Sequence, residues 1–326
     1  MTLTQLRYLI AIADSGLNIT QAAERVHATQ PGLSKQLKQL EDELGFQLFV
    51  RKGRSLEAVA PAGGKVIEHA RRLLAEAANI RSYAANERGE HSGRLLLATT
   101  HTQARYVLPP VIASVKRAFP QVSVDLLASS DADVLGQLKE ADLALISTAS
   151  SEPQGGIAVP LYRWRRVLLV PVSHPLAQLQ RAPTLAELAR HPLISYESST
   201  QADSSLQRTF HAAGVAPQMA MTASDANLIK TYVRAGLGAG LLAEMAVGNA
   251  EDHDLRILHA PPELPECITW AVIPRGRVLR DYALSLLQGL APQIDRRDLR
   301  QVLEGNLEPA WPQPPTWAAL TQSITV

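Results

Sequence analysis

Apolar positions follow two different rhythms along this chain, and the change falls near residue 90. Up to that point they recur every three or four residues, the spacing of helices that bury one face. From Arg94 onward, short apolar runs such as LLLATT, VSVDLLA and DLALIS alternate with stretches of helical spacing. That alternation predicts parallel sheets covered by helices on both faces. We therefore expect an α+β multidomain chain, with a mainly helical first part and a larger α/β part.

Residues 18–54 predict two short helices joined by a tight turn. Asn18 is a favourable N-cap, and the apolar positions up to Val26 share one helical face. After the connection 27–29, Thr29 can cap a second helix, with Pro31 in its first turn where a missing N–H costs little. Leu33, Leu37 and Leu40 then form one apolar stripe on this second helix.

The opposite face of the second helix is polar and cationic. Residues there and in its first turn that can reach base edges or phosphates are Thr29, Gln30, Pro31, Ser34, Lys35 and Lys38. A glycine-bearing basic turn follows, with Arg51, Lys52 and Arg54. The cap, proline, leucine stripe and basic turn together predict a winged helix-turn-helix that binds double-stranded DNA. The alternative is an ordinary helical hairpin with solvated lysines.

Residues 61–90 predict a long linker helix. Val66, Ala70, Leu73, Ala77, Ile80 and Ala84 are spaced by four and three residues in turn, as in a coiled-coil seam. Such a helix would pair two copies of the chain, whereas a helix packed on its own domain is the alternative. The polar stretch 86–93 is expected to be a hinge.

The α/β part is expected to form two subdomains with a ligand cleft between them. The strand and helix pattern assigns residues 91–162 and 267–303 to subdomain I, and residues 163–266 to subdomain II. One long helix is expected over 100–119. The tail 304–326 contains four prolines and is expected to be disordered.

Polar residues gather where predicted strands end. Thr100, Thr102 and Gln103 follow one strand, Ser147 and Thr148 end another, and Thr200 and Gln201 precede a helix. Hydroxyls, amides and free N–H groups at a helix start can hold a small anion without a cation. Simple helix capping is the alternative at each cluster. Arg163, Arg165 and Arg166 could also bind an anion, but a solvated strand edge is the favoured interpretation.

The sequence contains little that indicates catalysis or cofactor binding. The run GLGAG at 236–240 lies between a predicted helix and a strand, the reverse of a dinucleotide loop, and Gly236 is expected to end the helix. No nucleophile elbow, zinc-protease motif or phosphate loop occurs, and we expect no enzyme activity, cofactor or metal.

Composition narrows the class of protein further. No apolar run reaches the length of a membrane span and the N-terminus lacks a signal-peptide pattern, so a cytoplasmic protein is expected. Cys267 is the single cysteine and is expected to be a small buried hydrophobe. A net charge of +1 means that DNA affinity must come from local clustering of cations.

The residues from LRYLIAIADSG to LFVRKGR, followed by PAG, resemble the LysR-type transcriptional regulators. The segments ATTHTQARYVLP and SDANLIKTYVRAGLGAGLLAEMAV look like the CysB-like branch, which regulates sulfur assimilation and sulfonate use. The resemblance implies a DNA-binding domain over 1–60, a dimerising linker helix and a periplasmic-binding-protein-like effector domain over 91–303. It also implies homotetramers, contact with RNA polymerase, and effectors such as acetylserine, sulfate, thiosulfate or adenylylsulfate.

Carried over residue by residue, Thr100, Thr102 and Gln103 match the anion motif of that branch. This chain departs from the branch at three places: Ser147 and Thr148 stand at the third strand end, Gln201 stands beside Thr200, and Ala60 precedes the PAG motif. A small-molecule-binding or enzymatic α/β protein with an unrelated helical N-terminal domain remains the alternative.

Overall fold

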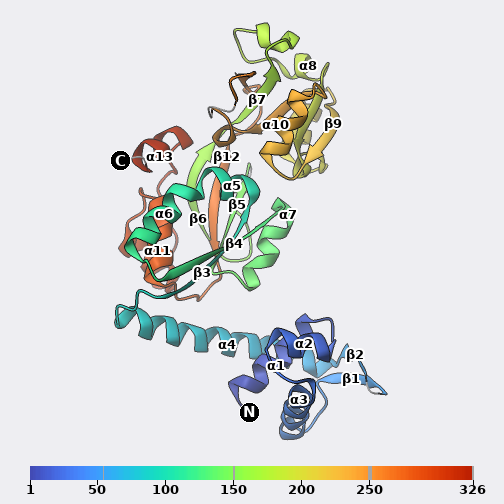
Figure 1. The fold of residues 1–326 in the computed structure, drawn as a ribbon, viewed down its shortest axis with the longest axis vertical. Coiled ribbons are helices and arrows are strands. Elements are labelled where there is room, and N and C mark those ends of the chain that lie inside the picture. Colours follow the sequence, from blue (N-terminus) through green and yellow to red (C-terminus); the bar gives the residue numbers. More distant parts are fainter. Residues whose placement is uncertain (54, 150, 249–251, 325–326) are drawn as a thin grey trace. The chain divides into compact units, whose positions relative to one another are not determined.

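The computed structural model describes residues 1–53, 55–149, 151–248 and 252–324. The chain divides into two compact units, residues 1–88 and 89–326 (Figure 1). The predicted α+β organisation with a helix-turn-helix unit and an α/β unit is confirmed. In the described part of the chain, no helix has the length and apolar character needed to cross a membrane.

The N-terminal unit contains three helices, a β-hairpin and a long fourth helix. They are α1 (Leu3–Asp14), α2 (Ile19–Arg25), α3 (Gln30–Leu44), β1 (Phe49–Lys52), β2 (Ser55–Val59) and α4 (Pro61–Glu87). The predicted caps are confirmed, because Asn18 accepts from Gln21 N and Thr29 accepts from Gly32 N. Helix α1 was not among the helices predicted from the sequence. Its first turn carries a capping box in which Thr2 and Gln5 satisfy each other's backbone N–H groups.

A close backbone approach fixes where α4 begins. The Ala60 N–H donates to the carbonyl oxygen of Leu48 at 2.9 Å. A Cβ on Gly63 would lie 2.1 Å from the same oxygen. Only glycine fits at that distance, so Gly63 of the PAG motif lets the start of α4 lie against the residue before β1.

Helix α4 divides its apolar positions between two environments. Ile67 and Ala70 are buried in the core of the N-terminal unit, and α4 contacts α1. Further along the predicted seam, Leu73 is 46% exposed and Ile80 is 64% exposed. The first turns of α4 therefore pack on their own domain, as the alternative interpretation held, whereas Leu73 and Ile80 present apolar side chains to solvent.

The C-terminal unit contains two five-stranded sheets. The first has the order β4-β3-β5-β12-β6 and the second β11-β7-β10-β8-β9. The strands of the first are β3 (Gly93–Thr100), β4 (Val122–Ser129), β5 (Leu143–Thr148), β6 (Ile157–Trp164) and β12 (Cys267–Ile273). Those of the second are β7 (Arg166–Pro171), β8 (Pro192–Tyr196), β9 (Gln218–Ala223), β10 (Ala239–Ala243) and β11 (Leu255–His259).

Neither sheet is parallel throughout, although the strands whose alternation predicted parallel pairing do pair in that way. Strands β3, β4 and β5 are parallel, but β12 pairs antiparallel with both β5 and β6. In the second sheet, β7 pairs antiparallel with β10 and β11. The chain leaves the first sheet through β6 and returns through β12. The strand that returns the chain runs antiparallel to the strands beside it. The strands that pass between the two sheets therefore make both sheets mixed.

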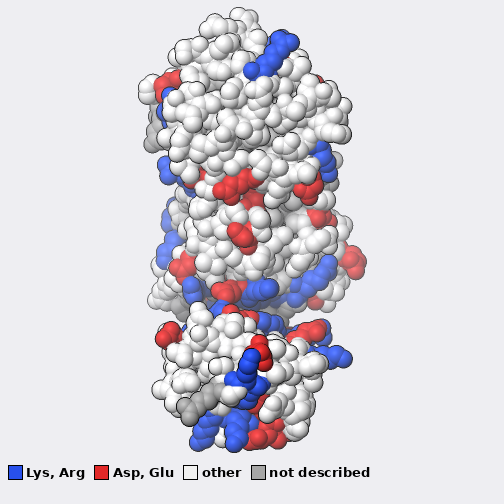
Figure 2. Space-filling view, turned by 90° about the vertical axis from the view of Figure 1, so that its right-hand side faces the viewer, with Lys and Arg blue, Asp and Glu red and all other residues white. Residues whose placement is uncertain are grey.

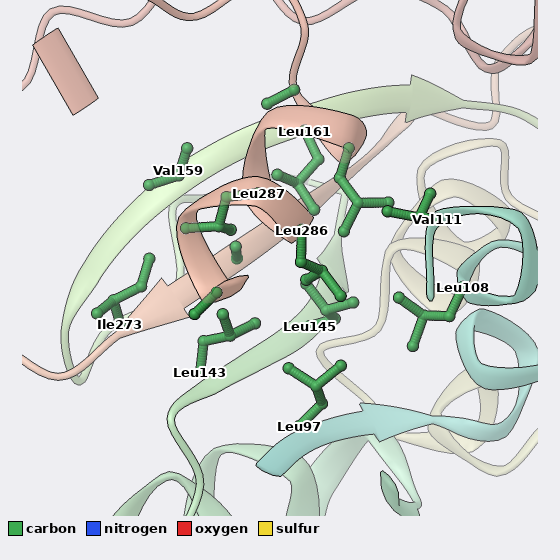
Figure 3. Close-up of a cluster of buried hydrophobic side chains, with 14 of the residues drawn as sticks. Leu97, Leu108, Val111, Leu143, Leu145, Val159, Leu161, Ile273, Leu286 and Leu287 are labelled. Atoms are coloured by element: carbon green, nitrogen blue, oxygen red, sulfur yellow. The ribbon is translucent and has the colours of Figure 1, made fainter. Parts of the chain in front are cut away.

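Helices cover both faces of the first sheet. The helices of the unit are α5 (His101–Tyr106), α6 (Leu108–Ala118), α7 (Asp131–Val134), α8 (Leu185–Leu188), α9 (Ser205–Ala212), α10 (Ala226–Arg234), α11 (Asp281–Leu290), α12 (Arg296–Leu303) and α13 (Trp317–Ile324). Figure 3 shows how Leu97, Leu145 and Leu161 from three strands meet Leu286 and Leu287 of α11. The single long helix expected over 100–119 is interrupted at Val107, ahead of two prolines, which gives α5 and α6.

The tail is ordered, and the expectation of a disordered segment is wrong for its described residues. Trp311 and Trp317 pack against the core of the first sheet, and Leu320 on α13 is 1% exposed. In Figure 1, α13 lies near the end of β6, the strand that it contacts. Proline-rich composition indicated little regular structure, but two tryptophans and a leucine bury enough apolar surface to hold the segment in place.

Candidate functional site

The outer face of α3 carries the polar and cationic residues that the sequence singled out. Leu33, Leu37 and Leu40 are buried, whereas Lys35 and Lys38 are exposed. Gln30 and Pro31 are exposed in the first turn, and Ser34 is half-buried. On the N-terminal unit, Figure 2 shows lysine and arginine side chains gathered at the surface beside a smaller acidic group. The leucine stripe leaves α3 no other way to pack, so its basic face points to solvent.

The cations predicted for the wing lie in different environments on the hairpin that follows α3. Arg51 Nη2 donates to Glu41 Oε2 at 2.8 Å, and Glu41 Oε1 accepts from Leu48 N at 2.9 Å. The Glu41 side chain is 8% exposed, so this ion pair ties β1 to the last turns of α3. Lys52 is 81% exposed and lies 3.7 Å from Glu57. Arg54, the third predicted cation, lies outside the described residues.

A cleft of about 530 Å³ opens between the two sheets of the C-terminal unit. Thr100, Thr102, Gln103, Ser147, Thr148 and Gln201 all line it, as the sequence analysis expected. Thr200 does not line it, because its hydroxyl donates to Glu197 O at 2.9 Å within its own turn. The strand ends therefore bring together six of the seven predicted residues from chain positions a hundred residues apart.

Helix α5 presents its first turn to the cleft. Thr100 caps it by accepting from Gln103 N at 3.4 Å. Thr102 Oγ1 lies 3.4 Å from Tyr196 Oη on the opposite side of the cleft. Thr99, the neighbour of Thr100, is buried on the other face of β3 and its hydroxyl has no hydrogen-bond partner. Alternation along the strand thus sends Thr100 to the cleft and Thr99 into the core.

Four polar side chains form a row beneath the cleft. Ser147, Thr269 and Tyr162 are neighbours on the adjacent strands β5, β12 and β6. Gln103 Nε2 lies 3.4 Å from both Ser147 Oγ and Thr269 Oγ1, and Gln103 Oε1 accepts from the Tyr162 hydroxyl. The Trp164 indole also donates to Thr269 Oγ1, at 3.1 Å. Thr269, Tyr162 and Trp164 were not predicted as site residues, since each looks like an ordinary strand residue in sequence.

The cleft also contains charged groups, contrary to the expectation of a site without them. Arg166 lines it and donates from Nη2 to Ser205 Oγ at 2.7 Å, so the strand-edge interpretation is wrong for this arginine. Arg163 and Arg165 instead pair with Glu266. Strand β7 begins at Arg166, directly after the chain leaves the first sheet, and this position brings its guanidinium to the cleft.

Asp131, at the start of α7, is a charged cleft residue that the sequence did not indicate. Its Oδ2 accepts from Ser198 Oγ at 2.9 Å, which links the two subdomains across the cleft. Burial raises the pKa of the Asp131 carboxyl, although the Ser198 hydrogen bond and the Arg166 charge oppose that shift. Cys267 also lines the cleft as a buried thiol, 3% exposed, and burial raises its pKa. The cleft is lined by two arginines (Arg166 and Arg208), three acidic residues (Asp131, Glu197 and Asp203) and many hydroxyls, a set that suits a small polar ligand.

Residues 3–63 match the bacterial regulatory helix-turn-helix protein, LysR family, and residues 88–294 match the LysR substrate binding domain. The chain therefore belongs to the LysR family of transcriptional regulators. It is 38% identical to the HTH-type transcriptional regulator CysB of Haemophilus influenzae, over 91% of this chain and 92% of that protein. It is 35% identical to the regulator Cbl of Escherichia coli, over 94% of this chain and 98% of that protein.

Solved structures agree with this assignment. The cofactor-binding domain of the Cbl transcriptional regulator superposes with a TM-score of 0.60 at 34% identity, covering 66% of this chain and 95% of that one. A point variant of full-length OxyR from Pseudomonas aeruginosa superposes with a TM-score of 0.67 at 22% identity, covering 89% and 97%, and supports the fold alone. The predicted resemblance to the CysB-like branch is confirmed by these matches.

Proposed function

We propose that this LysR-family regulator controls genes of sulfur metabolism in response to a small anionic or amino-acid-like effector bound in the cleft. The proposal rests on the lining of the cleft, which the first turn of α5 forms together with Ser147 and Gln201. Thr100, Thr102 and Gln103 match the anion motif of the CysB-like branch and line that cleft. Sulfate, thiosulfate, adenylylsulfate and acetylserine are the effectors to test.

Promoter DNA would bind the outer face of α3. Lys35 and Lys38 are exposed on it, and the N-terminus of α3 offers N–H groups to a phosphate oxygen. Lys52 extends the cationic surface along the hairpin. Charged side chains on an exposed helix supply affinity that depends on salt, while Gln30 and Ser34 can contact bases.

Two copies would pair through the exposed end of α4. Leu73 and Ile80 are separated by one heptad and are largely exposed, which suits a coiled-coil partner. Pairing of dimers into a homotetramer, contact with RNA polymerase and a cytoplasmic location are part of the same proposal. No catalytic step belongs to it: the cleft would act by binding, and closure on the effector would change how the oligomer bends or spaces its DNA sites.

The experiment has two independent readouts. Calorimetry of the full-length protein against each of the four effectors tests the cleft, and we expect at least one to bind. A mobility-shift assay on promoter DNA, with and without that effector, tests regulation. Failure of all four effectors would contradict the sulfur part of the proposal, whereas failure to shift any promoter DNA would favour an α/β binding protein of another kind.

A further inference from the structure

The end of the chain closes the outer edge of β6. This strand lies at the edge of the first sheet, where backbone groups would otherwise lack partners. Arg163 N donates to Pro315 O at 2.8 Å, and the Trp311 indole donates to Ala158 O at 2.8 Å. Gln293 Nε2 lies 3.1 Å from Pro160 O on the same edge. The tail is thus bound along the strand that carries Tyr162.

Trp317 contacts Tyr162 directly. The two rings lie 5.3 Å apart between centroids and are tilted by 52°. Tyr162 is fully buried, and Leu320, one turn after Trp317, is 1% exposed. A ring pair of this kind is stabilised beyond its buried area by about 0.5–1.5 kcal/mol. The side chains of α13 therefore pack against one side of the Tyr162 ring.

The Tyr162 hydroxyl determines which end of the Gln103 side-chain amide points toward Ser147 and Thr269. Burial holds the pKa of Tyr162 far above its usual value, so the phenol keeps its hydrogen and donates it to Gln103 Oε1. The Nε2 end must then point to Ser147 and Thr269. A glutamine has one accepting end and one donating end, so a fixed donor behind it leaves one favourable orientation.

This orientation of the Gln103 amide limits which hydroxyl hydrogen of the row can be donated to a ligand. Hydrogens of the Gln103 amide and the Trp164 indole both enter the pair formed by Ser147 and Thr269. The two hydroxyl oxygens lie 2.9 Å apart, and their mutual hydrogen bond uses one of their two hydrogens. Thr269 is fully buried, whereas Ser147 lines the cleft. When Thr269 donates within this pair, the Ser147 hydroxyl hydrogen is left to point at an acceptor in the cleft.

We propose that the C-terminal segment 311–321 is a brace that makes the cleft selective for anions. Trp317 holds Tyr162, Tyr162 holds the Gln103 amide, and the oriented row presents a hydroxyl hydrogen to the ligand. Trp317 and Tyr162 are positioning residues in this arrangement, since both act through Gln103. The inference rests on the proposed function, because it concerns how the effector cleft chooses its ligand.

The first test is Tyr162→Phe, which removes the donor and keeps the ring against Trp317. Calorimetry with sulfate, and with dimethyl sulfone as a neutral counterpart, measures selectivity. We expect sulfate affinity to fall about tenfold while the sulfone changes little, as for one lost hydrogen bond to a charged group. Tyr282→Phe is the matched control, because that buried hydroxyl donates to Arg94 O elsewhere in the same core. Equal sulfate affinity in both variants would overturn the inference.

The second test addresses the brace. Trp317→Ala should lower sulfate affinity in the same direction as Tyr162→Phe, and Trp317→Phe should restore it by keeping a ring against Tyr162. The double variant Tyr162→Phe with Trp317→Ala should lose little more than Tyr162→Phe alone, since both act on one contact chain. A Trp317→Ala protein that is less stable yet selects sulfate as the wild type does would show that the tail has a structural role only.

A structural readout separates this inference from the proposed function. If the wild type binds no sulfate, the anion part of the proposed function fails. Ligand-free crystal structures of the wild type and Tyr162→Phe then still decide the role of Tyr162. More than one conformer of Gln103 in the variant, against one in the wild type, would support the brace. A Gln103 side chain unchanged in the variant would refute it.

Discussion

Arg51 on β1 donates to Glu41 in the last turns of α3, and the two side chains join the hairpin to the helix that carries the proposed DNA-binding face. The pair gives Arg51 a role that its sequence position did not indicate. We expect Arg51→Ala to lower the free energy of unfolding by about 1–2 kcal/mol, because Glu41 would remain buried with its charge less well paired while Arg51 is partly exposed. Thermal or chemical unfolding of the full-length protein measures this.

Lys52→Ala is the control for that comparison. Its side chain is 81% exposed and its ion pair spans 3.7 Å, so the loss should stay below about 0.5 kcal/mol. Equal unfolding free energies for the two variants would mean that the Glu41 pair contributes nothing to the fold.

Lys35→Ala together with Lys38→Ala should weaken promoter binding and flatten its dependence on salt. Each phosphate contact that is lost should reduce the slope of log K against log[salt] by about one unit. Fluorescence anisotropy with labelled promoter DNA at several salt concentrations is the measurement. Lys139→Ala, an exposed lysine of the C-terminal unit, is the control. An unchanged slope in the double variant would place the DNA contact elsewhere.

Leu73→Glu should dissociate the oligomer, because it would set like charges against each other in a coiled-coil seam. Light scattering reports the change in mass, and weaker promoter binding should accompany it. Ala75→Glu introduces the same charge at an exposed position of α4 off the seam and should leave the mass unaltered. If both variants keep the wild-type mass, the exposed stretch of α4 is not the pairing surface.

Thr102→Val keeps the side-chain shape and removes a hydroxyl from the cleft. We expect effector binding to weaken by about 1–3 kcal/mol while promoter binding without effector stays as in the wild type. Calorimetry with the effector that binds best provides the number. Thr200→Val is the matched control, because Thr200 does not line the cleft. A Thr102→Val protein that binds as tightly as the control would exclude Thr102 from the effector site.

Anion binding should strengthen as the pH falls through the raised pKa of Asp131. Above that pKa the carboxylate repels an anion in the same cleft, and below it the neutral acid does not. Asp131→Asn should therefore bind sulfate at neutral pH better than the wild type and show a flatter pH profile between about pH 4 and neutrality. Calorimetric titrations across that window test the sign. A wild-type profile as flat as that of Asp131→Asn would rule out titration of this carboxyl.

Local patterns determined helices α2 and α3 of the N-terminal unit. Asn18, Thr29 and Pro31 act within one turn of their own positions, and the leucine stripe of α3 follows directly from helical geometry. The spacing of apolar residues therefore sufficed for α2, α3 and the exposed lysines. It also located six of the seven expected cleft residues, because strand ends can be found from composition and the carboxyl ends of neighbouring strands meet at one edge.

Only the tertiary structure decided which partner each of these groups meets. Arg166, Asp131, Tyr162 and Thr269 come from four separate elements, and strand pairing across more than a hundred residues brings the last two together. The sequence could not show that Arg51 is paired with Glu41 or that the proline-rich tail covers β6, since neither depends on local periodicity. Local propensity determines where helices and strands lie along the chain, whereas burial and hydrogen bonding between distant segments determine which side chains reach the cleft.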